Sequence, residues 1–328
     1  MLDTPDLSEL IEDAARRLAG RAVQTPLLSS SLLNQRVGGE VFLKAENLQH
    51  IGAFKFRGAY VALSRLSPEE RSNGVVAWSS GNHAQGVAAA ARLFGISATI
   101  VMPHDAPMSK RQRTEALGAR VVAYDRYSEN REDIAAALIG ETGGAAIPPY
   151  DHIDVISGQG TVGLEISRQL ETLKTSPDQI VVPCGGGGRT AGIATAIRHR
   201  HPSARIIIAE PQGFEDTCRS LTLGERQTVQ DGARSMCDAL QAPTPGAITF
   251  DINRQLLSGG VAVPDADVAD AMRFAFEHLK LVLEPGGAIA LAAILNGSIS
   301  AKGMTTAVVL TGGNVDPDLF SDVLKGVV

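Results

Sequence analysis

The sequence predicts an α/β fold in which helices cover mostly parallel β-sheets. Short apolar runs of strand length alternate along the chain with longer helical stretches, a rhythm typical of strand–helix–strand units. Gly- and Ser-rich turns directly follow several of these runs, and open α/β sheets bind their ligands beyond the carboxyl ends of their strands. We therefore expect the chemistry of the protein to lie in those turns.

The elements can be placed from the N-terminus onward. An apolar stripe with helical spacing covers residues 7–18, and Gly20 ends this first helix. Helices are also expected at residues 83–94 and 190–200. Strands are expected at residues 40–46, 74–80, 98–103, 120–125, 179–184, 204–210 and 306–311.

The composition indicates a globular enzyme that acts on a small molecule. Of the 328 residues, 44% are hydrophobic and 20% are charged, and the 36 acidic and 30 basic side chains are mixed along the chain. No basic cluster indicates nucleic acid as a partner, and no apolar run reaches the roughly 18 residues of a membrane span. The first residues lack a basic segment followed by an apolar one, so we expect a cytoplasmic protein.

A run of four glycines joins a strand to a helix start and predicts a phosphate-binding turn. The members of this glycine run are Gly185, Gly186, Gly187 and Gly188. Residues without side chains let several backbone N–H groups approach one anion, and the helix N-terminus adds partial positive charge. A turn that is merely tight is the alternative, but four glycines carry an entropy cost that such a turn does not require.

The same segment also fits a relaxed dinucleotide fingerprint. Glu210 ends the next strand at about the right distance, so an NAD(P)-dependent dehydrogenase is an alternative function. Two facts count against it: Arg189 occupies a position of the fingerprint, and a dehydrogenase leaves the other motifs of the chain unexplained.

The segment GAFKFRGA at residues 52–59 contains the candidate catalytic lysine. Lys55 opens a helix there, between Phe54 and Phe56. A single lysine at such a place is usually a solvated surface residue, but aromatic neighbours and a following Gly-Ala pair favour a desolvated amine with a lowered pKa. A neutral lysine amine can form a Schiff base with a carbonyl and later accept a proton.

With these motifs, the sequence closely resembles the fold-type II pyridoxal 5'-phosphate (PLP) enzymes of the serine/threonine dehydratase and serine racemase family, part of the tryptophan synthase β-like superfamily. The resemblance covers essentially the whole chain. Its motifs are TPL at 25–27, GAFKFRGA at 52–59, SSGNHAQ at 79–85, YDH at 150–152, GQGT at 158–161, the glycine run, EPGG at 284–287 and TGGNVD at 311–316. The ordered set is far more specific than any one motif.

The resemblance implies a role for each candidate residue. Lys55 would hold PLP through a Schiff base and act as the base at Cα, and Phe54 would pack against the ring. The glycine run would bind the phosphate, and Asn82 would donate to the ring oxygen. Thr311 would place a neutral hydroxyl at the ring nitrogen, which favours elimination. The substrate carboxylate would be held by Ser79, Ser80, Asn82 and His83.

The resemblance also implies two domains, each with a helix-covered, mostly parallel open sheet. Residues 1–48 and 149–328 would form a large PLP-binding domain, and residues 49–148 a small mobile domain that closes over the substrate. The implied reaction is the β-elimination of a β-hydroxy L-amino acid, such as serine or threonine, to a 2-oxo acid and ammonia. The implied assembly is a homodimer.

Two residues leave the substrate and a second activity open. Ser80 occurs in the racemase-like branch, where threonine dehydratases usually have alanine. It would either reprotonate Cα on the face opposite Lys55, which makes the enzyme a serine racemase, or only contact the carboxylate or water. Arg131 resembles an arginine of threo-3-hydroxyaspartate dehydratases that can pair with a second carboxylate, and an ordinary surface arginine is the alternative.

An acidic loop after the strand at 204–210 is a candidate metal site. Glu210 and Asp216 offer carboxylates and Phe214 a backbone carbonyl, and such oxygen ligands suit Mg²⁺ or Ca²⁺. These three positions also match the metal site of the family that the sequence resembles. A solvated acidic loop is the alternative.

Overall fold

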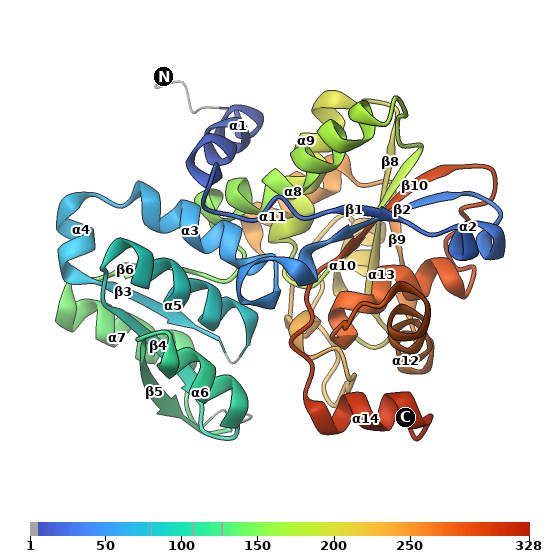
Figure 1. The fold of residues 1–328 in the computed structure, drawn as a ribbon. Helices are drawn as coiled ribbons and strands as arrows, with labels where there is room; N and C mark the ends of the chain where they lie inside the picture. The colour runs from blue at the N-terminus through green and yellow to red at the C-terminus, as the bar shows by residue number, and fades with distance from the viewer. Residues whose placement is uncertain (1–5, 80, 107, 126) are drawn as a thin grey trace.

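Two β-sheets organise the chain (Figure 1). The structure is a computed structural model that describes residues 6–79, 81–106, 108–125 and 127–328. The helices are α1 (Leu7–Leu18), α2 (Ser31–Val37), α3 (Lys55–Arg65), α4 (Pro68–Asn73), α5 (Asn82–Phe94), α6 (Met108–Ala116), α7 (Arg131–Thr142), α8 (Ile153–Thr172), α9 (Gly188–Arg200), α10 (Asp216–Leu223), α11 (Ala247–Leu256), α12 (Asp265–Phe274), α13 (Pro285–Leu295) and α14 (Pro317–Lys325). The strands are β1 (Leu27–Ser29), β2 (Glu40–Ala45), β3 (Val75–Trp78), β4 (Ala98–Pro103), β5 (Arg120–Tyr124), β6 (Ala145–Ala146), β7 (Gln179–Pro183), β8 (Arg205–Pro211), β9 (Gly259–Val263) and β10 (Thr305–Leu310). Short helical turns are η1 (Glu46–Leu48), η2 (His50–Gly52), η3 (Asp238–Leu240) and η4 (Ala275–Leu279).

The larger sheet has the strand order β1-β2-β10-β7-β8-β9, in which β1 is antiparallel to β2 and the other pairs are parallel. Helices α8 and α9 cover one face, and α12 and α13 the other (Figure 1). Successive residues of β7 therefore enter opposite cores: Ile180 and Val182 pack with α8 and α9, and Val181 packs with α13. This burial on both faces explains why the strands are continuous apolar runs.

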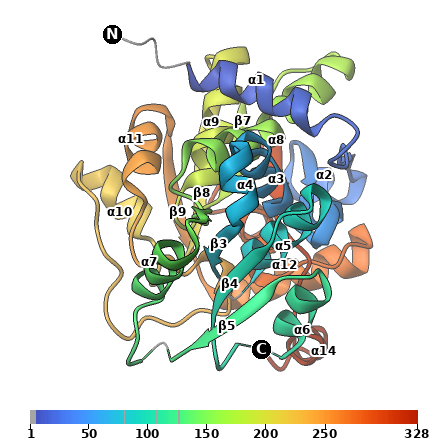
Figure 2. The same ribbon diagram turned by 90° about the vertical axis from the view of Figure 1, so that its left-hand side faces the viewer.

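The smaller sheet has the order β5-β4-β3-β6, and all its pairs are parallel. Helix α5 lies on one face and α7 on the other (Figure 2). All four strands come from residues 75–146, whereas the larger sheet takes strands from both ends of the chain. The domain boundaries near residues 49 and 148 remain a prediction.

The α/β fold with two helix-covered, mostly parallel sheets is confirmed. The seven expected strands correspond to β2, β3, β4, β5, β7, β8 and β10. The sequence analysis missed β1, β6 and β9, because the first two have only three and two residues and the third begins with a glycine pair. None of the helices that the structure describes combines the length and the apolarity needed to cross a lipid bilayer.

Candidate active site

One pocket lies between the two sheets and collects residues that follow three strands. Ser79 comes after β3, the glycine run after β7 and Thr311 after β10. The described site residues expected to bind the cofactor or the substrate all line it: Phe54, Lys55, Ser79, Asn82, His83, Arg131, Gly185, Gly186, Gly187, Gly188 and Thr311. Ser80 lies outside the described residues.

Lys55 is the first residue of α3 and opens onto the pocket. The backbone N–H of Phe54 donates to the Thr311 carbonyl over 3.2 Å, so the end of β10 holds the start of this helix. The Lys55 amine donates to the Pro149 carbonyl over 2.6 Å. Burial, together with the nearby positive charge of Arg189, lowers the pKa of Lys55 to about 7, and Glu284 opposes part of this shift. A large fraction of this amine is therefore neutral at neutral pH.

The glycine run forms an open cradle of backbone amides at the start of α9. Gly187 has a φ of 89° and is the N-cap of the helix, and no side chain caps the helix start. Among the described residues, the N–H groups of residues 185–190 have no hydrogen-bond acceptor. A Cβ atom on Gly186 would collide with the ring of Tyr150, so close packing requires glycine there. These unpaired amides at a helix N-terminus fit a phosphate group.

Asn82 lies in a chain of hydrogen bonds with Glu284, whose role the sequence analysis missed, and Thr311 makes a separate hydrogen bond. The Asn82 amide donates to Glu284 over 2.7 Å and accepts from Asn314 over 2.8 Å. The Thr311 hydroxyl donates to the Gly286 carbonyl over 3.2 Å. Burial raises the pKa of Glu284 to about 7, with a further contribution from Asp238.

His83 and Arg131 reach the pocket from the smaller sheet. His83 is buried, its Nε2 donates to the Ile147 carbonyl over 2.8 Å, and burial lowers its pKa to about 3, so the ring is neutral. The Arg131 guanidinium, at the start of α7, has no hydrogen-bond acceptor among the described residues. Arg131 therefore lies on the pocket lining, and its binding role remains a prediction.

The candidate metal residues lie apart from the pocket lining, where β8 ends and α10 begins. The two carboxylate oxygens of Glu210 accept from the N–H groups of Thr217 and Cys218, over 3.1 and 2.8 Å. Asp216 is fully buried, and both of its carboxylate oxygens lack a partner in the described structure. No group of three His, Cys, Asp or Glu residues that could hold a metal occurs in the described ranges.

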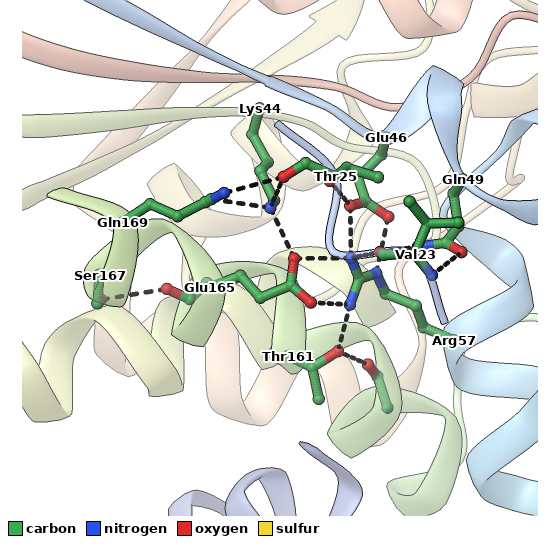
Figure 3. Close-up of polar contacts among 12 residues, drawn as sticks. Val23, Thr25, Lys44, Glu46, Gln49, Arg57, Thr161, Glu165, Ser167 and Gln169 are labelled. Carbon is green, nitrogen blue, oxygen red and sulfur yellow. Dashed lines mark hydrogen bonds and ion pairs between the residues drawn. The ribbon is translucent and has the colours of Figure 1, made fainter. Parts of the chain in front are cut away.

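A buried ion cluster of four residues anchors α3 to the larger sheet (Figure 3). Arg57 donates to Glu46 twice over 2.8 Å and to Glu165 over 2.6 and 2.9 Å. Lys44 donates to Glu165 over 2.6 Å. Because Arg57 lies two residues beyond Lys55, the ion cluster holds the helix that carries the candidate catalytic amine.

Comparisons with known proteins agree with the pocket. The profile of the family described as pyridoxal-phosphate dependent enzymes matches residues 19–312. The chain is 43% identical to an L-threo-3-hydroxyaspartate ammonia-lyase of Pseudomonas sp. (95% of this chain, 97% of the relative). It is 37% identical to a serine racemase of Schizosaccharomyces pombe (96% of each chain). A solved maize serine racemase superposes with a TM-score of 0.90 at 38% identity, covering 97% of each chain.

These matches extend over nearly the whole chain and give no support to the dinucleotide interpretation of the glycine run. A lysine amine with a lowered pKa and a cradle of unpaired amides line the same pocket, as a cofactor with an aldehyde and a phosphate requires. The chain belongs to the family of pyridoxal-phosphate-dependent enzymes.

Proposed function

We propose that this enzyme removes the β-hydroxyl group and the amine of a β-hydroxy L-amino acid, giving a 2-oxo acid and ammonia. The main observation in support is that Lys55, with a pKa of about 7, shares one pocket with the unpaired amides of the glycine run. Two of the relatives, both ammonia-lyases, are 43% and 40% identical to this chain. When bound, PLP delocalises the negative charge that forms at Cα of the substrate.

Lys55 is the base in this proposal. Its bond to the Pro149 carbonyl orients the amine, which takes the proton from Cα. The β-hydroxyl then leaves as water, and the released enamine hydrolyses to the 2-oxo acid and ammonia.

The other pocket residues bind and orient. The glycine run would hold the phosphate, and Phe54 would pack against the ring. The Thr311 hydroxyl would contact the ring nitrogen, and Asn82, which donates to Glu284 in the structure, would donate to the ring oxygen. Ser79, Ser80, Asn82 and His83 hold the substrate carboxylate.

Arg131 favours a substrate with a second carboxylate, such as threo-3-hydroxyaspartate. A guanidinium that lines the pocket and has no acceptor among the described residues can bind a carboxylate through two parallel hydrogen bonds. The relative at 43% identity acts on this substrate by name. Serine and threonine, which lack the second carboxylate, then use the same chemistry with weaker binding.

The test combines a spectrum with a substrate panel. Purified protein is expected to show the visible absorbance of lysine-bound PLP, removed by borohydride, and to form 2-oxo acids from threo-3-hydroxyaspartate, threonine and serine.

Replacing Arg131 by Gln should raise KM for hydroxyaspartate about 10- to 100-fold, because a charge-assisted pair is lost, and should change KM for threonine less than about threefold. The control Arg131→Lys keeps the charge. Absence of any 2-oxo acid contradicts the function, and equal KM changes contradict the role of Arg131.

Serine racemisation is a second candidate activity. A racemase at 37% identity over nearly the full chain supports it, together with Ser80 in the substrate turn. In this alternative the Ser80 hydroxyl returns a proton to Cα on the face opposite Lys55.

A structural Mg²⁺ or Ca²⁺ site at Glu210, the Phe214 carbonyl and Asp216 is also proposed. The supporting observation is the buried Asp216 carboxylate, which has no partner in the described structure and lies beside Glu210. A divalent cation would supply the missing positive charge there.

Domain closure and assembly complete the proposal. Residues 49–148 move as a domain over the pocket, and the ion pair between Lys110 of α6 and Asp238 of η3 joins the two sides in the structure. Exclusion of water during the reaction is the benefit of such closure. The enzyme works as a cytoplasmic homodimer.

A further inference from the structure

Arg189 is a buried cation next to the glycine run and forms no ion pair with a carboxylate in the described part of the chain. It is the second residue of α9, is only 6% exposed and lines the pocket. One terminal nitrogen donates to the Pro183 carbonyl, and the guanidinium carbon lies 4.2 Å from the centre of the Phe54 ring. Its Nε has no partner, and no carboxylate of the described chain forms an ion pair with it.

Such an arrangement is costly for the protein alone. A buried charge without a counter-ion loses its hydration and regains little from one carbonyl and one aromatic ring. Burial lowers the pKa of Arg189 to about 10, so the guanidinium still carries its charge at neutral pH. Glu284 and Glu46 favour this charge only through space, without an ion pair, so an anion that binds in the pocket would complete its pairing.

Two anions enter this pocket: the phosphate of the cofactor and the carboxylate of the substrate. Arg189 directly follows the glycine run, whose amides have no acceptor among the described residues. Of the residues assigned to the substrate carboxylate, Ser79 follows β3 of the smaller sheet and His83 lies in α5, which packs on that sheet. Chain position thus places Arg189 with the phosphate.

We propose that Arg189 is the cationic side chain of the phosphate subsite and adds a charge-assisted contact to those of the glycine amides. This rests on the proposed assignment of the glycine run to the phosphate. Because the guanidinium also stacks on Phe54, the residue before Lys55, phosphate binding and the position of the catalytic amine are coupled through one side chain.

The experiment compares PLP with pyridoxal, the same ring without phosphate. Apoenzyme is prepared from the holoenzyme, and each ligand is titrated by its absorbance change into wild type, Arg189→Met and Arg189→Lys. The Met variant is expected to bind PLP about 10- to 100-fold more weakly and pyridoxal within about threefold of wild type, because only PLP offers the anion. The Lys variant should recover part of the PLP affinity.

A second readout uses the melting temperature. Replacement of an unpaired buried charge by Met should leave the apoenzyme at least as stable as wild type, while the stabilisation by PLP becomes smaller. If the Met variant does not fold, the comparison is made with the Lys variant, which should lose more affinity for PLP than for pyridoxal.

Three results would overturn the inference. Equal weakening of PLP and pyridoxal assigns Arg189 to pocket shape alone. Unchanged PLP affinity with a raised KM for the amino acid assigns it to the substrate carboxylate, and unchanged values for both leave it without a ligand. A failed elimination assay in wild type would instead contradict the proposed function, whatever the binding data show.

Discussion

The molecule contains two groups of buried charges that are satisfied in opposite ways. In the ion cluster, Arg57 and Lys44 donate to Glu46 and Glu165, so the positive and negative charges balance within the chain. In the pocket, Lys55 and Arg189 donate only to backbone carbonyls in the described structure. The charges of the ion cluster are therefore neutralised within the protein, whereas the positive charges of the pocket need an anion from a bound small molecule.

The pKa values of the buried groups differ between the ion cluster and the pocket. Burial raises the pKa of Glu46, but the neighbouring Arg57 outweighs it and holds the value below the usual range. Without such a partner, the pKa of Lys55 falls to about 7 and that of Glu284 rises to about 7. A buried group that has an oppositely charged partner keeps its charge at neutral pH. A buried group without such a partner has its pKa shifted toward neutral pH, where it can exchange a proton.

The largest effect is expected from Lys55→Ala. It removes the attachment point of the cofactor and the base at Cα together, so 2-oxo acid formation should fall by about 10³-fold or more. Steady-state assay with saturating added PLP measures this, and Lys302→Ala on an exposed turn is the control. Activity within about tenfold of wild type would refute the role of Lys55.

Ser80→Ala should separate two activities of the pocket. If the hydroxyl protonates the face opposite Lys55, D-serine formation from L-serine should drop about 10²–10⁴-fold while elimination continues, because elimination needs only Lys55. Chiral chromatography beside a 2-oxo acid assay resolves the two. No D-serine from wild type, or equal loss of both reactions, would leave Ser80 as a carboxylate contact.

Glu165→Gln tests whether the ion cluster stabilises the fold. Arg57 and Lys44 would keep their charges but lose a shared partner, so the free energy of unfolding should fall by about 3 kcal/mol. The matched control is Glu171→Gln on the same helix, whose pair with Arg200 is largely exposed and should contribute less than about 1 kcal/mol. Urea unfolding of both variants decides, and equal small losses would show that the ion cluster is not needed for stability.

The smallest effect is expected at the acidic loop. A chelator should lower the melting temperature of wild type by a few degrees, on the order of a single weakly bound cation, and added Mg²⁺ or Ca²⁺ should restore it. Asp216→Asn should melt at the same temperature with and without chelator, whereas the control Glu225→Gln, on an exposed turn, should respond like wild type. A wild type that ignores the chelator and contains no bound divalent ion argues against the site.

Local sequence motifs made part of the fold and of the candidate site predictable. Lys55 and the glycine run each occupy a strand-to-helix turn whose residues are neighbours in the sequence, so the pattern carries the chemistry. Glu284 was not assigned a role, because its burial follows from packing against Asn82, 202 positions away. Arg189 was noted only as a misfit in the dinucleotide fingerprint, since its lack of a partner depends on tertiary structure.

The ion cluster illustrates the same limit. Lys44, Glu46, Arg57 and Glu165 look like ordinary surface charges in the sequence. Only the meeting of β2, η1, α3 and α8 brings them together, with Glu165 partly buried and the other three buried. The two missed short strands and β9 had too few β-branched or aromatic residues in a row to be recognised.

The position of β10 has a consequence for how the enzyme is made. It is the last strand of the chain, yet it pairs with β2 on one side and with β7 on the other. On the ribosome, β2 must therefore wait for more than 250 residues of synthesis, roughly half a minute at about 10 residues per second, before its parallel neighbour emerges. The smaller sheet is contiguous in sequence and can form during that interval. We expect nascent chains to carry one folded sheet and the apolar strand β2, which can pair with β1 but has its other edge open, a state in which aggregation competes with folding.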